Sequence, residues 1–231
     1  MMRFLLRQAL RSSALAWSAG LLLASCSLDS NPDKAATLPY IGEREVKPRA
    51  DGGPADTVFA VVPTFHLTNQ QGQPVTKATF AGKVYVTDFF FATCPSICPK
   101  MQSELLRVYE QYKGNPRVAF LSHTIDPDHD SIPVLRDYAE RLGVKDASQW
   151  HFATAPRDTI FGLAHAYFTA AQPDKEAPGG VAHNGTFALV DSKGHVRGLY
   201  DGMVKAEVDR LIRELPVLLK EEEQTAATAA N

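Results

Sequence analysis

The chain has 231 residues, of which 45% are hydrophobic and 22% are charged, so it is long enough to bury the core of one globular domain. Its formal net charge is −2, and lysine and arginine are scattered among acidic residues rather than gathered in a basic stripe. This pattern argues against proteins that bind nucleic acid through a basic surface, so we expect no nucleic-acid partner.

Residues 1–25 have the three parts of a secretory signal. Arginines without acids precede a short apolar stretch over Ala14–Leu23, which is too short to span a bilayer comfortably. The run Leu23-Ala24-Ser25-Cys26 that follows resembles the bacterial lipobox, in which the cysteine is acylated and becomes the mature N-terminus. We therefore expect a lipoprotein signal peptide over 1–25 and a membrane anchor on Cys26. An ordinary signal peptide or an uncleaved anchor, with Cys26 incidental, is the alternative.

Residues 26–55 are rich in Asp, Asn, Pro, Gly and Lys, which predicts a flexible tether between the membrane and the domain. Within it, the apolar segment Leu38–Ile41 is a candidate for docking on the domain. The folded domain is expected over 56–220, and the charged, then Ala/Thr-rich residues 221–231 are expected to form a disordered tail.

Strands alternate with helices along the domain. Alternating apolar residues predict a strand from Val58, interrupted at Pro63, and a turn at 71–74 that leads a hairpin into Val75. Further strands are expected over 84–91, 118–125, 150–154, 185–191 and 195–200. Helices are expected from Pro99 to Gly114, from Ile132 to Gly143, over 158–168 and over 204–218, the last kinked or shortened by Pro216, and a loop over 172–180.

This order predicts an α/β fold with a central mixed β-sheet flanked by helices and an N-terminal β-hairpin. Active residues of such folds lie beyond the carboxyl ends of the strands, and Cys94 follows the apolar strand 84–91. Cys98 comes four residues later, at the expected start of a helix whose N-terminus favours thiolate.

Two such thiols can bind a soft metal, exchange a disulfide or staple the turn. Adjacent thiolates chelate soft ions such as Cu(I), and a neutral imidazole would complete a trigonal site. A structural disulfide between Cys94 and Cys98 is possible in an oxidising compartment, but closing so short a loop would stabilise the fold little.

The run FFFATCPSICPKM resembles the Sco/SenC family, and the resemblance continues in HTIDPDHDSIPVLRDYAERLG, in WHFATA and in HNGTFALVDSKGHVRGLYDG, covering about Phe65 to Leu218. The family implies a thioredoxin-like fold that binds copper, Cu(I) or Cu(II), through Cys94, Cys98 and His183. It implies delivery of copper to the binuclear copper site of cytochrome c oxidase, or reduction of the cysteines of that site, rather than turnover as an enzyme. The implied partners are the oxidase subunit with that site, other copper chaperones and thioredoxin-like reductants. The implied location is a bacterial membrane facing the periplasm. The chain departs from the family at Asn184-Gly185 and over 172–180, which bears on the approach to the metal.

Three rival functions have weaker support. A thiol–disulfide oxidoreductase on the same fold usually has a CxxC motif, which is one residue shorter than the spacing here. Such enzymes also carry a cis-proline just ahead of a late strand, where this chain has His183 and Asn184, residues more typical of a metal site. A peroxiredoxin-like peroxidase usually has threonine where this chain has Phe91, and structural zinc would need a fourth ligand.

Other polar residues are interpreted as structural. The group around Asp126, Asp128 and Asp130 resembles a metal cluster, but it is typical of a turn and a helix cap. Asp88 either tunes the proton affinity of the thiols or is satisfied by a nearby backbone group. Met101 has the helical spacing of a core residue. The histidines expected to be structural or exposed are His123, His129, His151, His165 and His195.

Overall fold

The computed structural model of the chain describes residues 37–169, 171–174 and 181–229, and for 171–173, 181–183 and 229 it describes the backbone only. The expected signal peptide, the expected lipidation site Cys26 and the first part of the expected tether lie outside these residues. None of the described helices combines the length and the apolar character that a membrane crossing needs.

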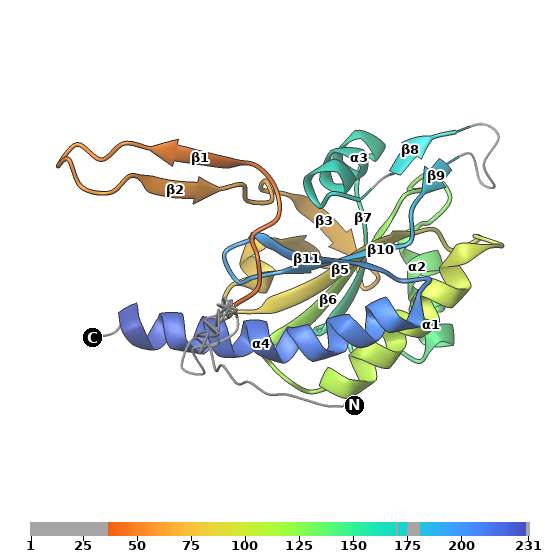
Figure 1. The fold of residues 1–231 in the computed structure, drawn as a ribbon. Helices are drawn as coiled ribbons and strands as arrows, with labels where there is room; N and C mark the ends of the chain where they lie inside the picture. Colours follow the sequence, from red (N-terminus) through yellow and green to blue (C-terminus); the bar gives the residue numbers. More distant parts are fainter. Residues whose placement is uncertain (1–36, 170, 175–180, 230–231) are drawn as a thin grey trace, which may run out of the picture. The chain divides into compact units, whose positions relative to one another are not determined.

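A seven-stranded mixed sheet forms the centre of the domain (Figure 1). In order across the sheet, its strands are β11 (Val196–Asp201), β10 (Thr186–Val190), β5 (Val84–Phe90), β6 (Val118–Thr124), β7 (Trp150–Thr154), β3 (His66–Asn69) and β4 (Pro74–Thr76). The central strands β5, β6 and β7 are parallel, and the other neighbouring pairs are antiparallel. Every residue of β5 and β6 is buried, as expected for parallel strands covered on both faces.

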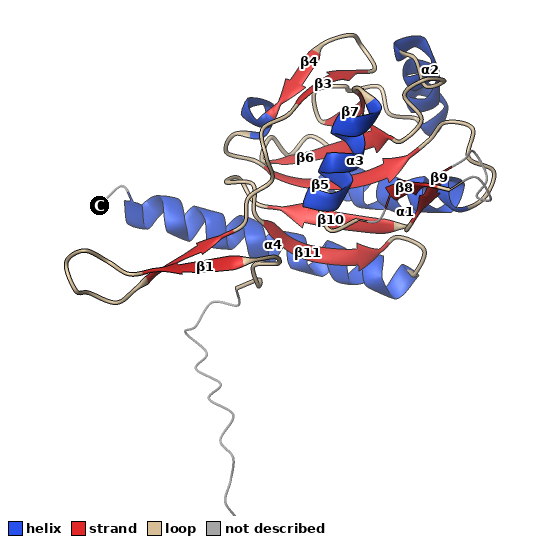
Figure 2. Cartoon of the chain, turned by 90° about the horizontal axis from the view of Figure 1, so that it is seen from above, coloured by secondary structure: helices blue, strands red, loops and turns tan. Residues whose placement is uncertain are grey.

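Helices cover both faces of this sheet and confirm the predicted layered α/β architecture (Figures 1 and 2). One helix lies on one face and the other three lie on the opposite face. Alternate residues of β5 accordingly face different helices: the Phe90 ring lies 4.9 Å from Tyr138, whereas the Phe89 ring lies 6.2 Å from Tyr167, just after the lone helix. The lone helix is α3 (Arg157–Ala166), and the others are α1 (Ile97–Tyr112), α2 (Ile132–Leu142) and α4 (Lys205–Ala229).

The predicted hairpin around 71–74 is formed by β3 and β4, but a second hairpin precedes it. β1 (Arg44–Lys47) pairs with β2 (Asp56–Phe59) in an antiparallel ribbon. Every residue of β1 is exposed, so the strand lacks the apolar alternation by which a half-buried strand is found. Part of the expected tether is therefore a β-hairpin.

The segment Leu38–Ile41 is docked on the domain through Arg197, whose side chain is almost fully buried. The Arg197 guanidinium donates a hydrogen bond to the Leu38 carbonyl oxygen (2.6 Å) and another to the Glu221 carboxylate (2.6 Å). The Tyr40 ring lies 4.0 Å from the same guanidinium. The domain thus begins near residue 38 rather than near 56, because these contacts hold the segment in place.

Helix α4 continues through Pro216 to Ala229, so the proline does not shorten the helix, which was one of the two expected effects. A proline has no N–H group, so the carbonyl oxygen of Ile212, four residues earlier, loses its partner within the helix. The Tyr112 hydroxyl of α1 donates to this carbonyl at 2.9 Å. The packing of α1 against α4 therefore satisfies the group that the proline leaves free.

The expectation of a disordered tail over 221–231 was wrong for the residues up to Ala229, which continue α4. Ion pairs hold this last part of the helix to the domain: Glu221 pairs with the buried Arg197, and Glu223 pairs with Arg117. Composition alone did not indicate these partners, which lie far away in the sequence.

Part of the loop expected over 172–180 is also strand. β8 (Ala171–Pro173) pairs antiparallel with β9 (Val181–His183), and Ala171 is the partner of His183. Residues 175–180, between the two strands, lie outside the described residues.

Two buried histidines lie in the sheet, and burial lowers the pKa of each, His123 and His151, to about 4. Nδ1 of His123 lies 3.1 Å from the Thr87 hydroxyl, and its ring stacks on Phe89 with centroids 4.5 Å apart. Its Nε2 has no hydrogen-bond partner among the described residues. Protonation would therefore place an unpaired charge in the core.

We predict that His123→Phe makes the protein less sensitive to acid. Wild-type His123 takes up a proton near pH 6.5 when unfolded but only near pH 4 when folded, so its contribution to stability is complete above pH 6.5 and is lost as the pH falls toward 4. Between pH 7 and pH 4.5 the variant should lose about 2 kcal/mol less unfolding free energy than the wild type, measured by urea denaturation at both values.

The exposed His165 provides the control, since His165→Gln should show the pH dependence of the wild type. An equal loss of unfolding free energy in wild type and His123→Phe would contradict the assignment of acid sensitivity to this ring.

Candidate metal centre

The turn after β5 carries Cys94 beyond the carboxyl end of the central strands. The N–H of Cys94 donates to the Phe91 carbonyl at 3.2 Å. One carboxylate oxygen of the buried Asp130 accepts both the N–H of Ala92 (3.0 Å) and the hydroxyl of Thr124 at the end of β6 (2.5 Å). The turn is thus fixed to the neighbouring strand as well as to its own.

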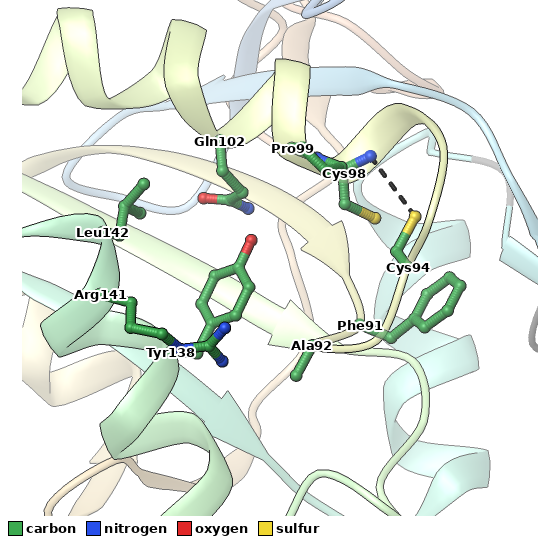
Figure 3. A pocket seen from close by; sticks show the side chains of 9 residues that line it. All are labelled: Phe91, Ala92, Cys94, Cys98, Pro99, Gln102, Tyr138, Arg141 and Leu142. Atoms are coloured by element: carbon green, nitrogen blue, oxygen red, sulfur yellow. Dashed lines mark hydrogen bonds between the residues drawn. The ribbon is translucent and has the colours of Figure 1, made fainter.

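Helix α1 begins at Ile97, with Ser96 as the residue that precedes its first turn, and Cys98 lies in that turn. The backbone N–H of Cys98 donates to the sulfur of Cys94 at 3.4 Å (Figure 3). Both cysteines are thiols rather than a disulfide, with exposed fractions of 8% for Cys94 and 1% for Cys98. The structure therefore brings the two predicted thiols together in their reduced form.

The thiol of Cys98 does not follow the expected preference for thiolate. Its hydrogen bond with the Cys94 side chain raises the pKa of Cys98, and burial raises it further. A helix N-terminus stabilises a nearby anion by about 1 kcal/mol, which is less than desolvation can cost a buried charge. A metal that binds here must displace the proton of Cys98.

Asp88 of β5 lies fully buried beneath α1, and two side chains donate hydrogen bonds to it. The Gln102 amide donates to one carboxylate oxygen at 2.6 Å, and the Ser122 hydroxyl donates to the other at 2.5 Å. The Trp150 indole N–H in turn donates to Ser122 at 2.9 Å. After the hydrogen bond with Cys94 and burial, the charge of Asp88 is a smaller cause of the raised pKa of Cys98, in line with one of the two roles expected for it.

A cavity of about 390 Å³ opens beside the two sulfurs, between α1 and α2 (Figure 3). The two cysteines form one end of it, and the side chains of α2 form the other. The lining residues are Phe91, Ala92, Cys94, Cys98, Pro99, Gln102, Tyr138, Arg141 and Leu142.

Sequence reasoning did not identify Gln102, Tyr138 or Arg141 as part of the site. Gln102 could have been found, because it lies four residues after Cys98 on a predicted helix and so on the same face. Tyr138 and Arg141 come from α2, and no pattern along the chain indicates that α2 packs beside the cysteine turn.

His183, the third predicted ligand, ends strand β9, and its side chain lies outside the described part of the chain. The backbone that follows it approaches α1: a Cβ atom added at Gly185 would lie 3.4 Å from the Met101 sulfur and 2.9 Å from Cγ of Met203. Met101 is buried one turn after Cys98. Among the side chains that are described, no three His, Cys, Asp or Glu residues converge as a metal site.

The turn after β6 forms ion pairs. Nδ1 of the exposed His129 lies 2.9 Å from the Asp126 carboxylate, which raises the pKa of His129. Arg157 of α3 pairs with Asp128 at 2.6 Å and reaches Asp126 at 3.6 Å. These contacts agree with the interpretation of this segment as a turn.

The chain is similar to known proteins over its folded part. The model of the SCO1/SenC family matches residues 54–219. The SCO1 protein homolog of Bacillus subtilis (strain 168) is 28% identical over 156 residues, which cover 67% of this chain and 80% of that protein. A protein of Stutzerimonas stutzeri that is named for copper binding is 30% identical over 167 residues, covering 70% of this chain and 78% of that protein.

Solved structures show the same architecture. A SCO1/SenC family lipoprotein from Bacillus anthracis str. Ames has a TM-score of 0.62 at 28% identity, covering 69% of this chain and 95% of that one. BsSco, described as a member of the Sco family of cytochrome c oxidase assembly proteins with a disulfide switch, has a TM-score of 0.61 at 26% identity, covering 69% and 94%. These likenesses confirm the thioredoxin-like fold. With the family match spanning most of its length, the chain belongs to the SCO1/SenC family.

Proposed function

We propose that this protein binds copper as cargo through Cys94, Cys98 and His183, and supports assembly of the binuclear copper site of cytochrome c oxidase. One observation carries the proposal: a reduced pair of thiols, linked by the Cys98 N–H to the Cys94 sulfur at 3.4 Å, lies beside an open cavity in a SCO1/SenC chain. The relative named for copper binding supports it.

The donor set fits copper better than harder metals. Thiolate sulfur is a soft ligand that favours Cu(I), and an imidazole serves both Cu(I) and Cu(II). Binding removes the thiol protons, since thiolates rather than thiols are the ligands. Because both cysteines line the cavity, a cysteine or histidine of an acceptor that enters it can attack the metal and take it by ligand exchange.

The place of His183 in the chain supports its role as third ligand. Gly185, two residues later, packs against Met101, which lies one turn after Cys98. Any side chain larger than glycine at 185 would meet Met203 and Met101, so the glycine allows β9 and its histidine to come close to α1.

A second candidate function is reduction of a partner's disulfide, which the close contact of two reduced thiols also favours. In this reaction a bond forms between the sulfurs of Cys94 and Cys98, and two electrons and two protons pass to the partner's disulfide, which becomes two thiols. The disulfide switch described for BsSco supports this candidate. The two functions use the same sulfurs and are compatible.

We also propose that the protein is a lipoprotein of a bacterial envelope, facing the periplasm, with a signal peptide over 1–25 and lipid on Cys26. The lipobox-like run and the lipoprotein from Bacillus anthracis support this proposal. In bacteria grown with a labelled fatty acid, the wild type should carry the label and collect with membranes, whereas Cys26→Ser should do neither. An unlabelled wild type would contradict the proposal.

The copper ligands can be tested in the full chain with Cys26→Ser as a background that cannot be acylated at this position. Reduced protein titrated anaerobically with Cu(I) should bind one copper per chain. Cys94→Ser and Cys98→Ser should each weaken binding by at least about a hundredfold, because even residues behind metal ligands contribute 10–100-fold. His183→Ala should weaken it by at least about tenfold.

The matched control is His165→Ala, an exposed histidine on α3 that should bind copper like the background protein. Unchanged affinity in His183→Ala would remove that residue from the ligand set. If the background protein binds no copper but forms a reversible Cys94–Cys98 disulfide, the copper function is excluded and disulfide reduction is the function supported.

A further inference from the structure

We propose that the cavity between α1 and α2 recognises the partner as a cysteine-bearing peptide segment with an acidic residue next to its cysteine. The inference rests on the proposed function, since both copper transfer and disulfide exchange bring a partner's cysteine to Cys94 and Cys98. It adds what that partner must look like. Four features of the cavity support the proposal: a hydrogen-bond acceptor that has no donor among the described residues, the phenol of Tyr138, the cation of Arg141 at the edge, and apolar walls.

The acceptor is Oε1 of Gln102. Its amide nitrogen is engaged by Asp88 at 2.6 Å, which fixes the orientation of the amide. Oε1 has no hydrogen-bond partner among the described residues, although Gln102 is 99% buried. In Figure 3 this oxygen points toward Leu142, on the cavity side of the helix. An unpaired buried acceptor costs free energy that a donor from an incoming molecule would recover, and a peptide N–H is such a donor.

The cation is Arg141, at the edge of the cavity beside the Tyr138 ring, whose centroid lies 5.9 Å away. Its Nε is paired with Asp137 at 2.9 Å, but both side chains are more than 60% exposed, so this pair contributes little. A guanidinium has five donors in a planar fork, and its remaining donors can take a second carboxylate in parallel. The edge of the cavity therefore selects an anionic group.

The size and walls of the cavity point to a short stretch of polypeptide. About 390 Å³ is within the range of sites that enclose small molecules or a few residues. Phe91, Pro99 and Leu142 supply apolar walls, and the Tyr138 hydroxyl supplies a donor. A copper ion alone uses none of these groups, whereas a peptide with an N–H group, an apolar side chain and a carboxylate uses them all.

A peptide cysteine in the cavity can react with Cys94 and Cys98 by disulfide exchange or by copper transfer. When Cys94 and Cys98 form a disulfide, the peptide thiolate attacks the Cys94 sulfur, the Cys94–Cys98 bond breaks, and the Cys98 sulfur leaves and takes up a proton. A second peptide thiolate then attacks the first peptide's sulfur in the mixed disulfide. The Cys94 sulfur leaves and takes up a proton, so two peptide thiols become one peptide disulfide and the two protein sulfurs become thiols. In copper transfer the peptide sulfur replaces a protein sulfur on the metal without change of oxidation state.

The test measures how fast two peptide thiols reduce the Cys94–Cys98 disulfide in the Cys26→Ser background. The probes are N-acetylated, C-amidated Ala-Cys-Glu and Ala-Cys-Lys, and the quantity compared is the ratio of their second-order rate constants. Arg141→Glu should lower the acidic-to-basic ratio about fivefold, because an exposed ion pair contributes up to about 1 kcal/mol and 1.4 kcal/mol is tenfold. The effect should shrink in 1 M salt.

The control is Arg213→Glu, the same change of charge on an exposed residue of α4 that does not line the cavity. It should keep the wild-type ratio, and the intrinsic reactivities of the two peptides cancel in this comparison. Equal ratios in Arg141→Glu and Arg213→Glu would overturn the proposal.

A second variant tests the cavity itself. Leu142→Phe adds bulk to one wall, so both peptides should react several-fold more slowly, whereas dithiothreitol, which has neither an amide nor a charge, should react as with the wild type. Peptide rates equal to those of the wild type would show that the peptides do not enter the cavity. Copper stoichiometry is measured on the wild type in parallel. A wild type that binds no copper would contradict the proposed copper function, whereas the rate ratios would still test whether the cavity recognises acidic peptides.

Discussion

The hydrogen bond from the Cys98 N–H to the Cys94 sulfur is the contact on which the site depends, because it joins the end of a strand to the start of a helix. Neither end can shift freely. Strand β5 is paired on both sides, with β6 and β10, and the turn after it is held by Asp130. Helix α1 is fixed to the same strand through Gln102 and Asp88. The sulfurs are therefore placed by the most buried part of the sheet.

Burial and access are balanced at the two thiols. The hydrogen bond with the Cys94 side chain and the burial of the thiol raise the pKa of Cys98 and so disfavour its thiolate. On the other side, the cavity exposes the pair to an incoming group. A buried pair on rigid elements gives a defined geometry, whereas an open side allows ligands to be exchanged. A protein that must hold copper and then release it needs both properties.

The sequence predicted those features that follow from local pattern. Strand β5, helix α1, the Cys94–Cys98 pair and the closing glycine of α2 all follow from periodicity, turn chemistry and spacing. The features that it did not predict depend on distant partners. The last turns of α4 are charged and look disordered until Glu221 meets Arg197, and β1, in which every residue is exposed, has no apolar face. Arg141 and Tyr138 join the site only because α2 packs beside α1. The ligand role of His183 came from family resemblance rather than from any local pattern.

The measurement that tests the central claim most directly is a crystal structure of the reduced protein loaded with Cu(I), with anomalous diffraction recorded at the copper edge. The account predicts one anomalous peak, bonded to the sulfurs of Cys94 and Cys98 and to an imidazole nitrogen of His183, with α1 and β5 unmoved. Copper bound at other residues, or at the cysteines with His183 turned away from it, would contradict the account.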